Sequence, residues 1–296
     1  MNKYLPSLRL RTLPLSMSGI VLGTGMAFSG HWASIAPIQW AVFVLAILTT
    51  LSLQTLSNLS NELGDALKGT DADQQGREAY GLQAGTVSLA EMKRLIALFI
   101  VLSILFGTAL VLLAFRPFSD PSGLNIGQTA LFLFLGALAI IGAMTYTLGK
   151  HSYGYIGLGD LGVFLFFGLL STIGGYYLQT QSLTPEVICA AVAIGCPCVG
   201  VLNLNNVRDM PHDRLHGKRT FASILGATGG RIYHACLLIA SLAIFAALGR
   251  YWTLCILPLW IGHVIYIFRH DGSDLDKQMP ILMFTTLFVA CLACIA

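Results

Sequence analysis

Nine apolar runs constrain this chain more than any other feature, because each is long enough to cross a lipid bilayer. A helix needs about 20 mostly apolar residues to span the hydrocarbon core. Such runs lie near residues 12–30, 37–60, 95–115, 127–147, 157–179, 184–206, 229–249, 251–268 and 280–296. Only 10% of the 296 residues are charged, whereas a soluble domain has roughly 25%. The sequence predicts an all-α integral membrane protein with nine transmembrane helices.

Lysine and arginine are unevenly divided between the two sides that nine spans create. If the N-terminus is cytoplasmic, two of the 17 Lys and Arg residues, Arg116 and Arg250, fall on the outer side and the other fifteen on the cytoplasmic side. Loops rich in Lys and Arg remain on the cytoplasmic side of a membrane. We therefore expect a cytoplasmic N-terminus and an external C-terminus.

A polar stripe ends the second apolar run. On a helix, the spacings of four, three and four place on one face the residues Gln54, Asn58, Asn61 and Asp65. Amide side chains alone would be explained by hydrogen bonding between packed helices. Ionisable groups at membrane depth usually face an interior cavity and mark function. The stripe therefore points to a site at the start of the first long cytoplasmic loop, 61–93.

A second acidic group opens the other long cytoplasmic loop, 207–228. Asp209 and Asp213 are four residues apart, although Pro211 lies between them and is expected to interrupt a regular helix because proline lacks an N–H. Carboxylates from both loops would repel one another unless a cation lay between them. Oxygen ligands suit Mg²⁺, which commonly bridges carboxylates to phosphate oxygens.

Basic residues lie on the same side as the acids. Arg and Lys are the expected counter-charges for a polyphosphate, and the candidates are Lys150, Arg208, Lys218 and Arg219. Each is explained equally well as a charge that sets topology. The sequence has no G-x-x-x-x-G-K-[ST] motif, so a P-loop nucleotide site is not supported.

Four stretches form a set that is typical of one family. NELGDALKGTD at 61–71 and NNVRDMPHDRLHGKRT at 205–220 resemble the two aspartate-rich motifs of the UbiA-type intramembrane prenyltransferases. With LRLRTLPLSMSGIVLGTG at 8–25 and YTLGKHSYGYIGLGDLGVFLFFG at 146–168, they are similar to the 1,4-dihydroxy-2-naphthoate polyprenyltransferase branch. Glu62 stands where the first motif usually has Asp, and Leu10 departs from the usual Arg-Pro-Arg pattern.

The resemblance implies one domain over residues 1–296, a bundle around a central cavity that opens to lipid and has a cytoplasmic cap. The implied Mg²⁺ ligands are Asn61, Asp65, Asp71, Asp209 and Asp213. The implied diphosphate-binding residues are Lys150, Lys218, Arg208 and Asn61. Tyr146 would lie along the path of the allylic cation, and the catalytic set would be Asp65, Asp209, Lys150 and Tyr146. The aromatic substrate region or polar stripe of the cavity would include Asn58, Gln54 and Arg11.

The activity that this resemblance implies is transfer of a polyprenyl chain from polyprenyl diphosphate to 1,4-dihydroxy-2-naphthoate, with loss of diphosphate and CO₂. The expected partners are these two substrates and the lipid bilayer, and not nucleic acid. The expected location is the bacterial cytoplasmic (inner) membrane, with the active site facing the cytoplasm.

Two other functions stay open. A sister enzyme would use 4-hydroxybenzoate, haem or a chlorophyll precursor. A secondary transporter would place its site near the bilayer midplane on broken helices, whereas the charges here lie at helix ends and in loops.

Overall fold

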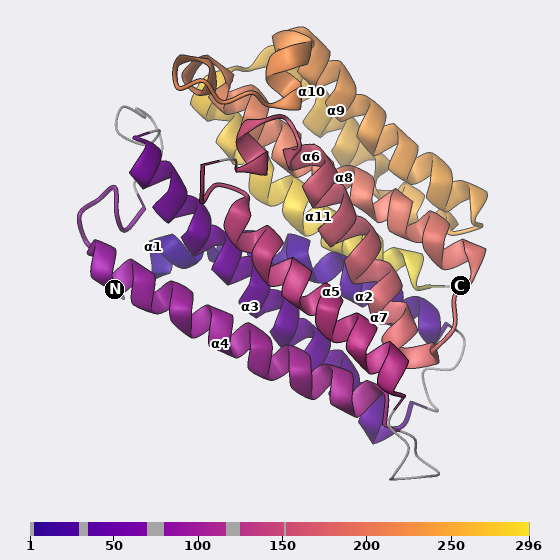
Figure 1. The fold of residues 1–296 in the computed structure, drawn as a ribbon. Coiled ribbons are helices and arrows are strands. Elements are labelled where there is room, and N and C mark those ends of the chain that lie inside the picture. The colour runs from indigo at the N-terminus through magenta and orange to yellow at the C-terminus, as the bar shows by residue number, and fades with distance from the viewer. Residues whose placement is uncertain (1–2, 30–34, 70–79, 117–124, 151, 296) are drawn as a thin grey trace.

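The computed structural model describes residues 3–29, 35–69, 80–116, 125–150 and 152–295. These residues form a bundle of long helices (Figure 1), with one isolated bridge between Ile156 and Arg219. The helices are α1 (Leu5–Leu8), η1 (Leu10–Thr12), α2 (Leu13–Ala27), α3 (Pro37–Lys68), α4 (Leu89–Ala114), α5 (Ile126–Thr145), η3 (Tyr153–Tyr155), α6 (Gly159–Val163), η4 (Phe164–Leu170), α7 (Ser171–Thr180), α8 (Pro185–Leu215), α9 (Phe221–Ala247), η5 (Tyr251–Ile256), α10 (Leu257–Arg269), η6 (Gly272–Lys277) and α11 (Gln278–Ala293).

Eight helical segments of the described chain are long and apolar enough to cross a bilayer, so the chain is a multi-pass membrane protein. They match the predicted runs from 37–60 onward. The first predicted run forms α2, which has 15 residues and is shorter than the about 20 that a span needs. The all-helical fold is confirmed, and a count of nine spans stays a prediction.

Glycines let α2 pack closely against α7. A Cβ atom at Gly23 would lie 2.1 Å from the backbone oxygen of Thr172, and one at Gly19 would lie 1.9 Å from Ser171 Oγ. Small residues four apart allow this close approach of backbones in membrane helices. Even though α2 is short, this packing makes it an integral part of the bundle.

Two helices extend past the predicted ends of their apolar runs. The α3 helix continues to Lys68 and ends at Gly69, which has a left-handed φ of 72°, a conformation that favours glycine at a helix end. The α8 helix continues to Leu215 and passes through Pro211. The expected interruption at Pro211 is therefore wrong, and membrane helices tolerate proline when neighbouring groups satisfy the freed backbone. The starts of both predicted long loops are helical.

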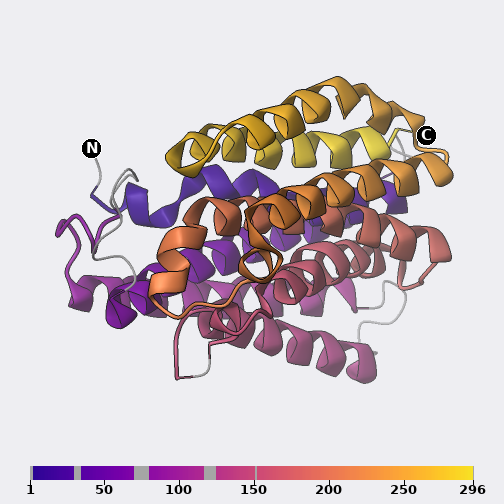
Figure 2. The same ribbon diagram turned by 90° about the horizontal axis from the view of Figure 1, so that it is seen from above.

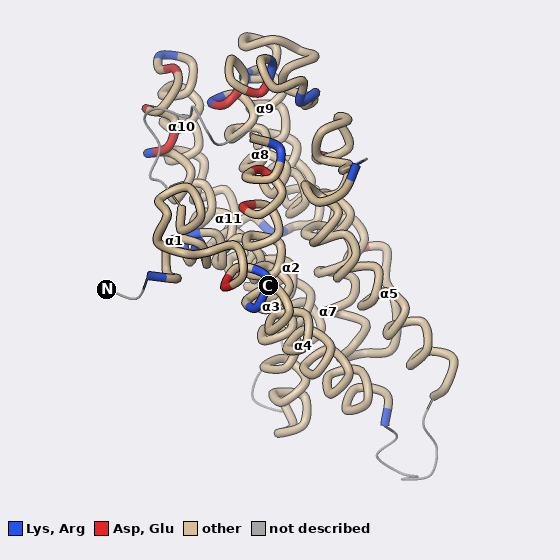
Figure 3. Tube along the Cα trace, turned by 60° about the vertical axis from the view of Figure 1, so that its left-hand side comes forward, with Lys and Arg blue, Asp and Glu red and all other residues tan. Residues whose placement is uncertain are grey.

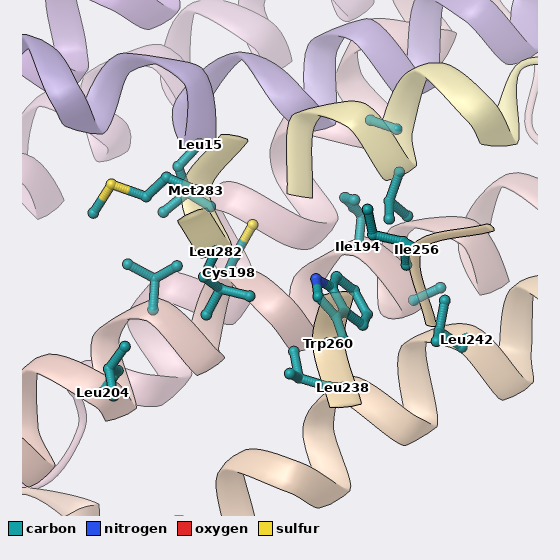
Figure 4. Packing of buried hydrophobic residues seen from close by; sticks show 14 of the residues in the cluster. Leu15, Ile194, Cys198, Leu204, Leu238, Leu242, Ile256, Trp260, Leu282 and Met283 are labelled. Carbon is teal, nitrogen blue, oxygen red and sulfur yellow. The ribbon is translucent and has the colours of Figure 1, made fainter. Parts of the chain in front are cut away.

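The largest buried core lies among α2, α8, α9, α10 and α11. Figure 4 shows part of it, where Trp260 packs beside Ile194, Leu238 and Ile256. The indole N–H of Trp260 donates to Thr285 Oγ1 at 2.9 Å, which satisfies its one polar group. In contrast, α4 and α5 leave large apolar side chains exposed outward, as lipid-facing helices do.

The two ends of the chain lie at opposite ends of the bundle. In Figures 1 and 2, α1 is near the N-terminal label, and the last turn of α11 is near the C-terminal label. This arrangement agrees with an odd number of crossings.

In Figure 3, α5 and α7 are tan throughout because they contain no Lys, Arg, Asp or Glu.

Candidate functional site

A cavity of about 710 Å³ lies among helices that include α2, α3, α4, α5, α6, η4, α7 and α8. This volume falls within the range of about 300–1,000 Å³ that is usual for small-molecule sites. Most of its lining is aliphatic or aromatic, including Ile20, Leu110, Phe132, Phe166 and Leu178. Its polar lining residues are mainly Arg9, Thr12, Ser16, Thr49, Thr50, Gln54, Ser57, Asn58, Asn61, Tyr146, Tyr153 and Asn205.

The amides of the predicted polar stripe line this cavity and form one network. Gln54 Nε2 donates to Asn58 Oδ1 and to Thr12 Oγ1, both at 3.1 Å. Asn58 Nδ2 donates to the Leu8 carbonyl and to Thr12 Oγ1, both at 3.0 Å. The network joins α3 to the N-terminal segment, and so the start of the chain forms part of the cavity wall.

The segment 146–158, here called the linking loop, holds the first acidic motif. Tyr155 OH donates to Asp65 Oδ1 at 2.8 Å, and Lys68 Nζ contacts Ser152 Oγ. Thr147 Oγ1 donates to the Ser60 carbonyl at 3.0 Å and lies 3.2 Å from Asn61 Oδ1. A Cβ atom at Gly64 would lie 2.5 Å from Thr147 Oγ1. Glycine at 64 therefore lets the loop reach α3.

The linking loop also contacts the second motif. The N–H of Arg219 donates to the Tyr155 carbonyl at 3.0 Å. Two ammonium groups lie over the Tyr155 ring, with Lys68 Nζ 3.7 Å and Lys218 Nζ 5.7 Å from the ring centroid. A cation within about 6 Å of a ring centroid is attracted by the ring face. Tyr155 is thus the residue that connects the two motifs.

Tyr146 lies at the start of the linking loop, with its ring on the cavity. Its ring meets the Tyr153 ring edge-on at 5.2 Å. A Cβ atom at Gly154 would lie 2.9 Å from Tyr146 Cζ, and one at Gly159 would lie 3.1 Å from its hydroxyl. The glycines of this stretch therefore make room for the tyrosine.

The pKa of Tyr146 lies above its usual value. Removal from bulk water is the main cause, followed by Tyr153 and by the negative charges of Asp160, Asp65 and Asp213. Burial likewise raises the pKa of Tyr153 to about 12. Both rings therefore stay protonated and neutral at physiological pH.

The two aspartates of the second motif have different partners. Asp209 accepts from Arg208 Nε at 2.6 Å and from Nη2 at 2.7 Å, while Arg208 Nη1 contacts Asp276. Lys218 Nζ lies 3.3 Å from Asp213 Oδ1. The other Asp213 oxygen, Oδ2, is buried and has no hydrogen-bond partner among the described residues. Arg208 is thus committed to two carboxylates and positions Asp209, rather than pointing free toward a phosphate.

The remaining predicted residues are placed apart from this group. Lys150 is exposed on the linking loop. Arg11 donates from Nη2 to Tyr80 OH at 3.2 Å, and Arg9 lines the cavity in its place. Glu62 faces away from the cavity lining, where it accepts from Ser7 Oγ and the Leu82 N–H. Asp71 lies outside the described residues.

Sequence reasoning missed Tyr155, Lys68 and Arg9 as members of the site. The signal for Tyr155 was present in the unusual density of glycine and tyrosine between 146 and 158. Nothing in the spacing of Arg9 and Arg11 distinguishes the one that reaches the cavity.

The oxygen ligands at the site fit Mg²⁺ shared with a phosphate better than a metal held by protein alone. In the part of the chain that is described, no group of three His, Cys, Asp or Glu side chains is close enough to hold a metal. Mg²⁺ usually takes one or two carboxylates and completes its shell with water and substrate phosphates. Asp213 Oδ2, buried and unpartnered in the described structure, is a suitable ligand atom.

Comparisons with known proteins identify the family of this chain. The UbiA prenyltransferase family model matches residues 21–291. The 1,4-dihydroxy-2-naphthoate octaprenyltransferase of Haemophilus influenzae is 40% identical over 95% of this chain and 91% of its own. The Escherichia coli protein of that name is 42% identical over 82% of this chain and 75% of its own.

A UbiA homolog from Archaeoglobus fulgidus, solved with GPP and Mg²⁺, superposes with a TM-score of 0.64. It covers 99% of both chains at 15% identity, so this likeness concerns the fold. The family match and the curated relatives each span most of the sequence. This chain belongs to the UbiA prenyltransferase family.

Proposed function

We propose that this chain transfers a polyprenyl group from polyprenyl diphosphate to 1,4-dihydroxy-2-naphthoate. The products are diphosphate, CO₂ and a demethylmenaquinol, an intermediate of menaquinone biosynthesis. The observation that carries the proposal is the similarity, over nearly the whole chain, to a relative named for this reaction. The cavity supports it, because a long apolar lining suits an isoprenoid tail and the polar part suits an aromatic acceptor.

The diphosphate would lie between the two acidic motifs. Asn61, Asp65, Asp209 and Asp213 would hold Mg²⁺, together with Asp71 beyond the described residues. The ion would neutralise negative charge on the leaving oxygens. The ammonium groups of Lys68 and Lys218 already face one site around Tyr155, and Lys150 would join them when the substrate binds.

The apolar wall of the cavity would protect the allylic cation that forms as the diphosphate leaves. Exclusion of water prevents hydrolysis of a reactive fragment. The neutral ring of Tyr146 lines the cavity, where the negative face of an aromatic ring attracts a cation. Gln54 and Asn58 would hydrogen-bond the acceptor, whose electron-rich ring attacks the cation and then loses its carboxylate.

The proposed location is the cytoplasmic membrane of a bacterium, with the acidic motifs facing the cytoplasm and the linking loop in the cap over the cavity. The uneven distribution of Lys and Arg supports this orientation.

The test uses membranes that contain the protein, Mg²⁺ and a labelled polyprenyl diphosphate. One arm receives 1,4-dihydroxy-2-naphthoate and the other 4-hydroxybenzoate, and the product mass is measured. We expect a decarboxylated prenyl product in the first arm alone. Product only from 4-hydroxybenzoate would assign the chain to a sister activity, and no product in either arm would reject the proposal.

A further inference from the structure

Arg9 has a backbone conformation that arginine rarely adopts. It lies between α1 and η1 with φ 49° and ψ 52°, in the left-handed region. Among the described non-glycine residues only Gln181 shares a positive φ. Such strain persists where the surrounding structure enforces it, and it is concentrated at functional sites. The conformation turns the chain so that Arg9 lines the cavity.

Tyr80 holds the guanidinium of Arg9 in a fixed plane. Arg9 Cζ lies 3.9 Å from the Tyr80 ring centroid, a distance at which the planar group is attracted by the ring face. Tyr80 is itself buried, and its hydroxyl accepts from Arg11 Nη2 at 3.2 Å. The ring occupies the face of the guanidinium, and hydrogen bonds can form at its edge.

One nitrogen of that edge has no acceptor among the residues that the structure describes. Arg9 Nε is buried and, within the described chain, has no hydrogen-bond partner. No described carboxylate forms an ion pair with Arg9, although the pairs of Arg208, Lys218 and Arg231 are present. Buried donors are nearly always paired in folded proteins. A guanidinium edge matches a planar carboxylate through two parallel hydrogen bonds.

The other polar groups of this part of the cavity are neutral. Thr12, Gln54 and Asn58 line it with Arg9, and Gln54 Oε1 is buried without a described partner. A free acceptor of this kind suits a hydroxyl donor. Around Tyr155, by contrast, the groups are two ammonium ions and the Asp65 carboxylate, which suit a metal-bound diphosphate.

We propose that Arg9 is the residue that binds the carboxylate of the aromatic acceptor, and that the Gln54 carbonyl oxygen accepts from a ring hydroxyl. Tyr80 and Arg11 are positioning residues for Arg9. The inference rests on the proposed function only for the identity of the acceptor, since the site itself selects an aromatic ortho-hydroxy acid. It makes Arg9 a determinant of acceptor specificity.

The first experiment measures binding without turnover. Calorimetry on the purified protein compares 1-hydroxy-2-naphthoate with 1-naphthol, which lacks the carboxylate. We expect the acid to bind roughly 10–100-fold more tightly, as for a charge-assisted pair. Arg9→Gln should abolish this preference and Arg9→Lys should retain part of it, while Arg94→Gln on the exposed start of α4 should preserve it.

The second experiment separates the two substrates kinetically. Arg9→Gln should raise KM for 1,4-dihydroxy-2-naphthoate roughly 10–100-fold, with KM for the prenyl diphosphate within about twofold of the parent. A rise in KM for the prenyl diphosphate alone would assign Arg9 to the diphosphate and overturn the inference. Equal binding of acid and naphthol by the parent would also overturn it. Absence of prenyl transfer with normal acid binding would instead reject the proposed function and retain the Arg9 site.

Discussion

Three acidic residues of the two motifs have the same carboxylate chemistry but different surroundings. Asp65 accepts from a neutral tyrosine hydroxyl, and Asp209 is held by both nitrogens of one arginine edge. Asp213 faces Lys218, and its other oxygen is buried with no partner in the described parts of the chain. A carboxylate fixed by charged hydrogen bonds is pre-organised for a metal, since it need not reorient on binding. Substitution of these residues should therefore affect metal binding.

Replacing the acids tests their role as ligands. Asp65→Asn and Asp209→Asn should each lower turnover at least about 10²–10³-fold, because a charge that stabilises the transition state is lost. Thermal unfolding should stay close to that of the parent. The matched control is Asp274→Asn, a half-exposed carboxylate that pairs with Lys277, which should leave turnover unchanged. Full activity of either variant, or of the parent in EDTA, would contradict metal binding here.

Lys150 tests whether an exposed residue joins the site on substrate binding. If it only sets topology, Lys150→Gln should be silent, because many other cations mark that side. If it donates to the leaving diphosphate, loss of one such donor costs about 10²–10³ in rate. We expect a severe loss for Lys150→Gln, a partial loss for Lys150→Arg, and unchanged abundance. Turnover is measured at saturating prenyl diphosphate, with exposed Lys93→Gln as the control.

At the residue scale, sequence reasoning identified residue types better than their partners. Gln54, Asn58 and Asn61 were predicted to share one helix face, and all three line the cavity. The cavity-lining arginine was harder to predict. Arg9 has a positive φ, and it lines the cavity where Arg11 was expected to. The tertiary partner of Arg208, Asp276, lies 68 residues away, and no local pattern predicts such a pair.

At the scale of elements, the linking loop gives the two motifs one shared support. Its side chains contact α3, and its backbone pairs with Arg219 after α8. The helix periodicity predicted that the stripe continues to Asp65, but the end of the apolar run at 60 hid the continuation of α3 to Lys68. The end of an apolar run indicates where a segment leaves the lipid. The helix itself can continue as long as its backbone hydrogen bonds form.

Tyr155 tests this shared support. Tyr155→Phe removes the hydrogen bond to Asp65 but keeps the ring that Lys68 and Lys218 both approach. A hydrogen bond to a charged group contributes about 1.5–3 kcal/mol, so we expect about a tenfold loss of turnover and a higher Mg²⁺ concentration for half-maximal rate. Tyr155→Ala removes the ring as well and should lose more.

The Mg²⁺ dependence of the rate shows whether Tyr155 supports the Asp65 ligand or only stabilises the fold. A purely structural role for Tyr155 would lower the unfolding temperature without shifting the Mg²⁺ requirement. Tyr251→Phe is the matched control, because Tyr251 is exposed at the start of η5. A Tyr155→Phe variant with the Mg²⁺ requirement of the parent would contradict the link to Asp65.

At the scale of the whole molecule, the proposed site lies at one end of the bundle, and exposed apolar side chains lie along α4 and α5. The composition predicted a membrane protein, and the length of the apolar runs predicted eight of the spans that the structure contains. The cavity could not be predicted in this way, because it depends on how the helices around it pack. The apolar residues that line the cavity are of the same types as those that face lipid, so the sequence does not distinguish them.

The orientation of the bundle in the membrane is the last prediction. After replacement of the seven native cysteines, single cysteines are introduced as Lys93→Cys at the start of α4 and Ser182→Cys between α7 and α8, both at exposed positions. These positions lie on opposite sides if Lys and Arg set the topology. A membrane-impermeant thiol reagent should label position 182 in intact cells and position 93 only after permeabilisation. Detergent-solubilised protein, in which both should react, is the control. Labelling of position 93 from outside would reverse the topology and separate the acidic motifs from substrates made in the cytoplasm.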